Sequence, residues 1–183
     1  ESRTILPDSR EYLAVADNII AGKGVILDEG ALAKRPPVYP LFLAAHRAMV
    51  PDLLAIQITQ SLLGGLIGVL VFLLGRALLD RTSAARAAVG CVFMPLLIFT
   101  GPALLIESLH ATLLLTEVLL LIHATRHSGW WALPAGLVSG VSALLHPGHA
   151  LFFIVAGTIL ILRRSGRAVP LYAATAVLVI SCW

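Results

Sequence analysis

The chain has 183 residues, of which 58% are hydrophobic and 13% are charged, with a formal net charge of +3 and a mean hydropathy of +0.93. An ordinary soluble domain is about half apolar and about a quarter charged, so the composition excludes a soluble protein and predicts a membrane protein. The positive charge comes from dispersed arginines rather than one basic block, so nucleic acid is not an expected partner.

The first expected element is a short amphipathic helix at the start of "PDSREYLAVADNIIAGKG". Its apolar residues recur at helical spacing and give one stripe: Tyr12, Leu13, Ala16, Ile19 and Ile20. Gly22 and Gly24 predict its end. Asp8 stands at its start and Glu11 follows three residues later, a spacing typical of a capping box. A carboxylate kept ionised at a helix N-terminus would also suit a general base, and both interpretations stay open.

The stretch "ALAKRPPVYPLFLAAHR" places two cations directly before a proline-rich segment. Pro36, Pro37 and Pro40 fix their own φ and favour extended geometry in the residues before them. We therefore expect a stiff polyproline-like strut from which Lys34 and Arg35 project. Two roles are open for these cations: attraction to anionic lipid headgroups, or binding of one phosphate by a bidentate arginine with a lysine beside it.

The remaining chain predicts an all-α, polytopic membrane domain. A bilayer core of ~30 Å needs about 20 mostly apolar helical residues. Residues 1–51 are expected to form an extracytoplasmic loop, and residues 52–183 a transmembrane domain of a longer protein, truncated at both ends. Cys91 and Cys182 lie in apolar runs without metal-like spacing and are interpreted as packing residues. Six candidate spans follow one another: 53–76, 86–102, 105–124, 129–145, 148–163 and 168–183.

The arginines predict the orientation of these spans. They fall in alternate loops, which the positive-inside rule assigns to the cytoplasm: Arg76, Arg81, Arg86, Arg126, Arg163, Arg164 and Arg167. The turns "TGPALLIES" and "LLHPGHA" then lie outside, together with residues 1–51. An outward-facing site is therefore expected where Asp8, Glu107 and the histidines of the second turn gather.

Glu107 lies in "PALLIESLHATLLLTEVLL", on the same helix face as His110 and Glu117. An ionisable side chain near a helix core costs ~2.5–3.5 kcal/mol on insertion scales unless it faces a partner or a wet cavity. Glu107 is either exposed at the membrane interface or is an acid that lines an outward-open cavity. Glu117 is deeper, and we expect it to pair with another helix.

His146 and His149 flank a Pro-Gly turn that interrupts the helical spacing needed to align two metal ligands. They are interpreted as interfacial histidines or as hydrogen-bond partners of a bound anion, with a metal pair as the alternative. His46 and Arg47 end an apolar stretch, and we expect them to reach lipid headgroups.

Four ordered segments resemble the GT-C membrane glycosyltransferases that use polyprenyl-phosphate-linked sugars, the superfamily of the protein O-mannosyltransferases and the aminoarabinose transferases of lipid A. The segments are "DSREYLAVADNIIAGKG", "AKRPPVYPLFLA", "FMPLLIFTGPALLIESL" and "SGVSALLHPGHALFF". The resemblance covers about residues 7–155. It implies a GT-C-like helical bundle whose first outer loop contains the amphipathic helix.

The resemblance also implies roles for individual residues. Asp8 matches the acid/base candidate of the first outer loop, and Glu107 matches an acidic position at the outer end of a later helix. Arg35, with Lys34 beside it, matches the basic position near the lipid phosphate. Two positions depart from the family's pattern: His146, where relatives often have arginine, and Ser9, where a second acid can stand. The expected substrate-binding residues are Glu11, Tyr12, Lys34, Arg35, Tyr39, His146 and His149.

The mechanism that this resemblance implies is in-line transfer of a sugar from polyprenyl phosphate to an acceptor hydroxyl at the outer face of the cell membrane. Asp8 takes the hydroxyl proton, while the cations neutralise the departing phosphate. The partners are the lipid-linked sugar, a protein, lipid or glycan acceptor, and membrane lipids. No cofactor or metal is required, although a divalent metal stays possible. The alternative function is a secondary transporter in which Glu107 or Glu117 carries protons.

Overall fold

The computed structural model describes residues 7–27, 36–50, 52–100 and 103–183. Over these residues it is all-α, with no β-strand, as predicted. The helices are α1 (Pro7–Ile20), α2 (Val38–Met49), α3 (Leu53–Leu78), α4 (Arg81–Val92), α5 (Pro95–Thr100), α6 (Glu107–Arg126), the 3-10 turn η1 (Gly129–Trp131), α7 (Ala132–Ala143), α8 (His149–Leu162) and α9 (Ala168–Ser181).

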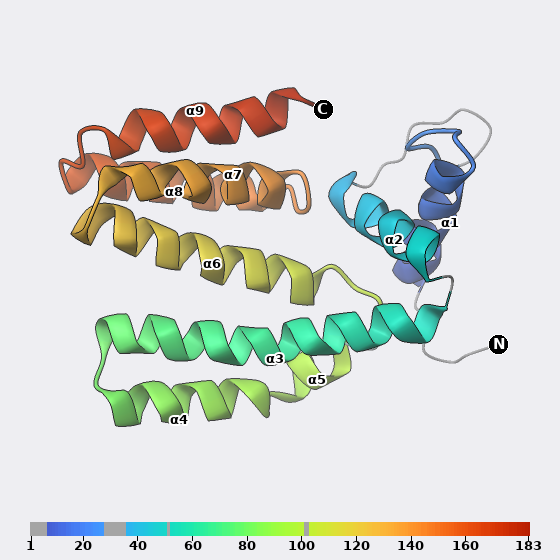
Figure 1. The fold of residues 1–183 in the computed structure, drawn as a ribbon, viewed down its shortest axis with the longest axis horizontal. Coiled ribbons are helices and arrows are strands. Elements are labelled where there is room, and N and C mark those ends of the chain that lie inside the picture. The colour runs from blue at the N-terminus through green and yellow to red at the C-terminus, as the bar shows by residue number, and fades with distance from the viewer. Residues whose placement is uncertain (1–6, 28–35, 51, 101–102) are drawn as a thin grey trace.

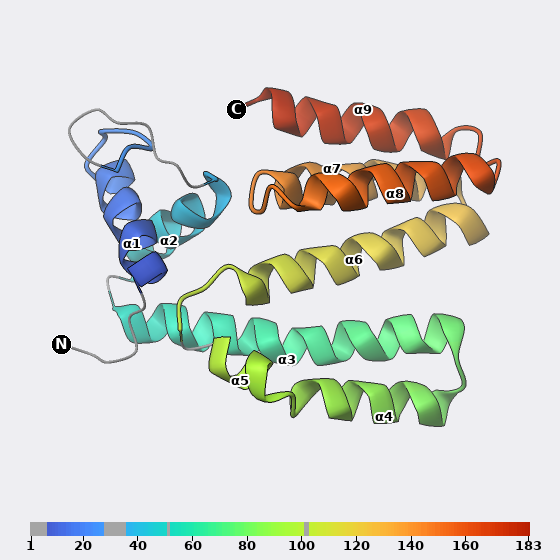
Figure 2. The ribbon, with the colours of Figure 1, turned by 180° about the vertical axis from the view of Figure 1, so that it is seen from behind.

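Helices α3, α4 and α6 to α9 lie side by side as a bundle, and α1 and α2 pack across one end of it (Figures 1 and 2). The α3–α4, α6–α7 and α8–α9 connections share the opposite end, and they carry the arginines that the sequence places in alternate loops. We call this the arginine end. The end that holds α1, α2, the start of α6 and the α7–α8 turn is called the acidic end. The seven loop arginines therefore lie at the opposite end of the bundle from Asp8, Glu107 and His146, as predicted.

Two helices of the described chain are long and apolar enough to cross a bilayer, α3 with 26 residues and α6 with 20. At 1.5 Å per residue they are about 39 and 30 Å long. Helices α8 and α9 are apolar but have 14 residues each, about 21 Å. These lengths, with the composition, fit a membrane protein whose shorter helices accompany two full-length ones.

The expected span 86–102 is wrong, because the structure divides this region into two helices. Helix α4 begins earlier, at Arg81, because the Asp80 carboxylate accepts hydrogen bonds from the backbone N–H groups of Thr82 and Ser83. Hydrogen bonds to its carboxylate lower the pKa of Asp80 below its ordinary value. The hydrogen bond from the Ser83 side chain makes the largest contribution, and the backbone hydrogen bonds add to it. The helix ends at Val92, and Pro95, which has no N–H, begins the short α5.

Helix α1 confirms the predicted amphipathic helix but moves its details. It begins at Pro7, so Asp8 lies within the first turn, and the expected capping box with Asp8 as the cap is wrong. Tyr12 and Ala16 of the predicted stripe are buried, but Ile20 is exposed. The helix ends as predicted, since Gly22 and Gly24 adopt φ of 74° and 87°, a left-handed conformation that glycine accepts without strain.

The expected extended geometry is wrong at Pro40, the last of the three prolines, because this residue lies within helix α2. Pro37 already has helical dihedral angles, and Pro40 is the third residue of the helix. The first four N–H groups of a helix have no partner within it, so a proline there costs no hydrogen bond. The Val38 N–H donates instead to the Leu144 carbonyl at 3.4 Å, which ties the start of α2 to the end of α7.

Small residues bring the bundle helices into close contact. A Cβ atom added to Gly136 of α7 would lie 2.0 Å from Thr175 Oγ1 and 2.3 Å from the Tyr172 carbonyl of α9. One turn on, a Cβ at Gly140 would lie 2.8 Å from the Ala176 carbonyl. Within a bilayer, such close backbone approach gives helices their van der Waals contact.

The α1–α2 pair is joined to the bundle through one buried amide. Gln60 of α3 donates from Nε2 to the Tyr39 hydroxyl at 2.7 Å and to the Leu105 carbonyl at 2.9 Å. Nearby, the Ser9 hydroxyl of α1 donates to the Ala103 carbonyl at 2.7 Å. The start of α1, α2, α3 and the segment before α6 are therefore held together at the acidic end.

We predict that Gly136→Ala destabilises the protein, because the new methyl group collides with backbone of α9 that cannot move alone. Overpacking of this kind costs about 1–3 kcal/mol. Thermal unfolding of the purified protein in detergent measures the loss. Gly157→Ala in α8 is the matched control, since nothing lies within 4 Å of a Cβ placed there. An equal unfolding temperature for the two variants would contradict the contact.

We also predict that Gln60→Leu loosens the α1–α2 pair, because it leaves the buried Leu105 carbonyl and Tyr39 hydroxyl without their amide donor. A lost buried hydrogen-bond partner costs about 1–3 kcal/mol. Hydrogen exchange of residues 36–50 should speed up more than that of α8. The control is Ser61→Ala, whose hydroxyl bonds only within its own helix and is exposed. Unchanged exchange in Gln60→Leu would show that the bridge does not hold the pair.

Candidate functional site

The candidate site lies at the acidic end, where the first turns of α1, α2 and α6 meet the α7–α8 turn. Its floor is an apolar cluster: Tyr12, Ala16, Tyr39, Leu43, Ala44, Ile56, Leu104 and Leu145. The Tyr12 and Tyr39 rings meet edge to face, with centroids 4.8 Å apart. Aromatic pairs in this geometry add about 0.5–1.5 kcal/mol beyond their burial, so the α1–α2 contact is rigid where it supports the site.

Tyr39 is completely buried, and it is the polar group at the centre of this floor. Burial raises the pKa of its phenol above the ordinary value, and the hydrogen bond from Gln60 opposes this rise. Electrostatic interactions with Tyr12 and Glu107 also raise this pKa. The phenol is therefore neutral at physiological pH and keeps its O–H as a donor. Tyr12 and Tyr39, the two tyrosines expected to bind substrate, are both buried in this cluster.

The two acids that the resemblance singles out both lie at this end. Asp8 is exposed in the first turn of α1, next to Ser9, which is bonded to Ala103. Glu107 is exposed in the first turn of α6, four residues after Ala103 in the chain. Glu11 is half-buried, one turn along α1 from Asp8. The expected positions of Lys34 and Arg35 lie outside the described residues.

The His146 and His149 rings both contact His110, and the His149 backbone N–H donates to the His146 carbonyl at 2.9 Å. The His110 ring stacks on His146, with centroids 5.0 Å apart, and meets His149 edge-on at 5.4 Å. His146 is exposed, and its Nδ1 accepts a hydrogen bond from the Gly148 N–H at 3.1 Å. His149 is 2% exposed and so is part of the interior. Of the two histidines expected at the membrane interface or at a bound anion, His146 is therefore exposed and His149 is buried among helices.

Glu117 pairs with other helices, as predicted. Its Oε2 lies 2.9 Å from His149 Nε2 of α8, and its Oε1 accepts a hydrogen bond of 2.6 Å from the Tyr172 hydroxyl of α9. The carboxylate is completely buried. Ser139 of α7 completes the group, with its Oγ 2.9 Å from the Tyr172 hydroxyl and 3.4 Å from His149 Nε2.

Sequence reasoning missed Gln60, Ser139 and Tyr172, which bond to the predicted residues. A signal was present, since each is a polar side chain within an apolar helix, and such residues face the interior of a bundle. His46 and Arg47 also differ from expectation. His46 Nε2 lies 2.8 Å from Thr59 Oγ1 of α3, and Arg47 forms an ion pair with Asp17 of α1. Both contact neighbouring protein helices.

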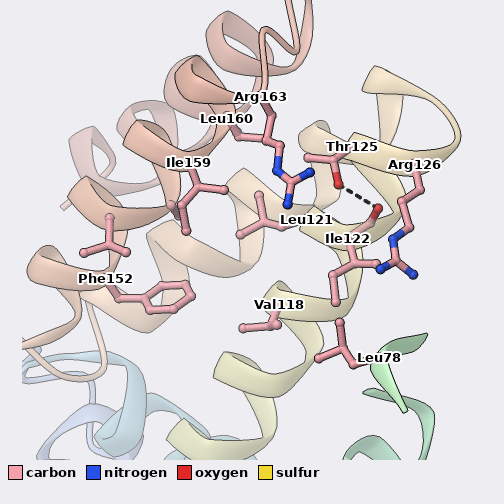
Figure 3. Close-up of a pocket in the computed structure, with 12 residues that line it drawn as sticks. Leu78, Val118, Leu121, Ile122, Thr125, Arg126, Phe152, Ile159, Leu160 and Arg163 are labelled. Carbon is pink, nitrogen blue, oxygen red and sulfur yellow. Dashed lines mark hydrogen bonds between the residues drawn. The ribbon is translucent and has the colours of Figure 1, made fainter. Parts of the chain in front are cut away.

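A cavity of about 470 Å³ opens at the other end of the molecule, between α6 and α8 (Figure 3). Its walls are mostly aliphatic, and Arg126 and Arg163 lie on the side of the cavity that faces the arginine end of the bundle. It contains neither carboxylate nor histidine, so it offers no acid or base for a reaction. Its lining is Leu78, Val118, Leu121, Ile122, Thr125, Arg126, Phe152, Val155, Ala156, Ile159, Leu160 and Arg163.

The acidic end can supply general acid–base chemistry, because it carries the exposed carboxylates of Asp8 and Glu107 and the exposed imidazole of His146, which can donate a hydrogen bond to an anion. His146 accepts at Nδ1, so the neutral ring carries its proton on Nε2. Over the described ranges, no group of three or more His, Cys, Asp or Glu side chains is placed to hold a metal ion.

The comparisons with known proteins agree with a transferase. No curated protein and no solved structure matches the chain. Residues 34–183 match the family described as dolichyl-phosphate-mannose-protein mannosyltransferase, from the proline-rich segment to the end of α9. The match covers most of the chain, and the chain therefore belongs to this family of membrane glycosyltransferases of the GT-C type.

Proposed function

We propose that the protein transfers a sugar from a polyprenyl-phosphate donor to an acceptor hydroxyl, at an extracytoplasmic site formed by its acidic end. The observation that carries the proposal is the Ser9–Ala103 hydrogen bond, because it fixes the Asp8 turn of α1 beside the segment that leads into Glu107. Two carboxylates from distant parts of the chain thus share one end of a bundle of a glycosyltransferase family. The family match favours transfer over the transporter alternative.

Asp8 is the proposed general base. Its carboxylate accepts the proton of the acceptor hydroxyl, the hydroxyl oxygen bonds to the anomeric carbon, and the bond from that carbon to the phosphate oxygen breaks. Phosphate is a good leaving group, so Lys34 and Arg35 need only neutralise its charge. The segment that follows these cations is anchored, since Val38 is bonded to Leu144 next to the α7–α8 turn. Glu107 is proposed to face the sugar or the acceptor, and no metal is required.

The bundle is proposed to cross the membrane several times, with the arginine end in the cytoplasm. Alternate loops carry the arginines, as the positive-inside rule requires. A protein acceptor is expected from the family description, and a lipid or glycan acceptor would present the same hydroxyl chemistry. His146, with its Nε2–H exposed, is proposed to bind the phosphate or the sugar. Glu11 is proposed to support Asp8.

We predict that Asp8→Asn in the full-length protein lowers sugar transfer from a labelled polyprenyl-phosphate mannose at least about 100-fold, the scale of a lost general base. Expression and thermal stability should not change. Asp17→Asn is the matched control, because Asp17 lies on the same helix and is occupied by Arg47. Full activity in Asp8→Asn would sink the role of Asp8.

Arg35→Ala is expected to raise the KM for the same donor about tenfold, the scale of one charge-assisted hydrogen bond, with a smaller effect on kcat. Its unfolding temperature should match that of the unsubstituted protein. Lys23→Ala is the control and should keep the donor KM, because Lys23 is an exposed cation that also precedes α2 in the chain. An unchanged KM in Arg35→Ala would return this arginine to the role of a headgroup contact.

A further inference from the structure

The buried polar group of the bundle extends from the acidic end into the interior. It begins at His110, which is half-buried one turn along α6 from Glu107, and it ends at Glu117. His149, Ser139 and Tyr172 lie between them, on α8, α7 and α9, and none of these three is more than 2% exposed. The transfer reaction proposed above uses none of Glu117, Ser139 and Tyr172.

The hydroxyl groups fix the direction of every hydrogen bond in this group. The Tyr172 hydroxyl donates its only hydrogen to Glu117 Oε1, so the Ser139 hydroxyl must donate to the Tyr172 oxygen. The Ser139 oxygen can then only accept from His149, which places the proton of a neutral His149 ring on Nε2. His149 Nδ1 is left as an acceptor, and it receives the Nε2–H of His110 at 3.3 Å. Both rings are therefore Nε2–H tautomers in the resting state.

Two open acceptors stand at the ends of this chain of bonds. Glu117 Oε2 accepts no hydrogen bond among the described groups, although His149 Nε2 lies 2.9 Å from it. His110 Nδ1 likewise has no partner in the described part of the chain, because the one hydrogen bond of this ring is made by Nε2. The positive charge of a proton that binds at His110 Nδ1 can therefore be balanced by the Glu117 carboxylate at the other end of the chain of bonds.

We propose that His110, His149 and Glu117 form a proton relay between the acidic end and the interior of the bundle, with Ser139 and Tyr172 as positioning residues. A proton binds His110 Nδ1, and His110 passes its Nε2 proton to His149 Nδ1. His110 is again neutral, now as the Nδ1–H tautomer, and His149 is an imidazolium beside ionised Glu117. One proton has entered, and the reverse steps release it.

The Glu117 carboxylate is the neighbour that favours this storage of charge. The titratable groups that face the relay in the described structure are His146, stacked on His110, and Tyr172, bonded to Glu117. No arginine or lysine is paired with Glu117 there, so the carboxylate is the counter-charge for a cationic His149. A buried charge is tolerated only when it is paired, which ties the charge of His149 to the presence of Glu117. The relay could carry away the proton that the acceptor hydroxyl loses during sugar transfer, and this use of it rests on the proposed function.

The test is nitrogen-15 NMR of histidine-labelled, full-length protein in lipid nanodiscs, followed as the pH is lowered. The nitrogen shifts distinguish the two neutral tautomers from the imidazolium, and each of the histidines is assigned by its own substitution. We expect His110 and His149 to begin as Nε2–H tautomers and to change together with one midpoint. A resting Nδ1–H tautomer at His149, or a His149 ring that stays unchanged while His110 titrates, would overturn the relay.

The variants extend the same measurement. In Glu117→Gln, the imidazolium signal of His149 should be lost, while the exposed His146 titrates as before. In His110→Phe, the pH-dependent change in the His149 nitrogen shifts should be lost. His123→Phe, a change at the arginine end of the same helix, should leave that change intact. Persistence of the His149 imidazolium in Glu117→Gln would contradict the relay. Because no activity is measured, absence of sugar transfer would refute the proposed function and leave this result standing.

Discussion

The side-chain amide of Gln60 is the interaction on which the arrangement of the acidic end depends. Its two N–H groups reach acceptors that are 21 and 45 residues away in the chain, on α2 and on the segment before α6. It adds to the hydrogen bonds that Ser9, Val38 and His46 make from the α1–α2 pair to the rest of the bundle, whereas apolar contacts alone hold helices together without fixing their register. A directional bond from a completely buried donor supplies that register. The relation between Asp8 and Glu107 follows from it and from the Ser9 hydrogen bond.

The sequence was sufficient to predict the fold class, the positions of most helices and the placement of seven arginines at the end opposite Asp8 and Glu107. Periodicity and arginine placement are local signals, and each acts within one helix or loop. The errors occur where a local preference competes with another group. Pro40 favours extended backbone before it, but the first turn of α2 accepts a proline at no cost. Pro95 interrupts a run that hydropathy alone treats as one span.

The candidate site was only partly predictable for a different physical reason. Glu107 and Glu117 stand out because an ionisable group in or near an apolar run is costly, and Asp8 stands out because it lies at the start of a predicted helix. Ser139 and Tyr172 carry no charge, and their importance arises from helices 33 residues apart in the chain that meet in space. The position of His149 in the interior likewise depends on α8 turning back across α6 after the Pro-Gly turn. Such pairings are decided by packing between helices, which no single stretch of sequence contains.

The contact between Glu117 and Tyr172 also sets an order for assembly during synthesis. The two residues are 55 positions apart, and α7 and α8 are made between them. At about 5–20 residues per second, Glu117 is synthesised roughly 3–11 s before Tyr172. For that interval α6 has a carboxylate without the hydrogen bond that holds it in the finished bundle. The polar contacts among helices α6 to α9 therefore form late and as a group, once α9 has been made.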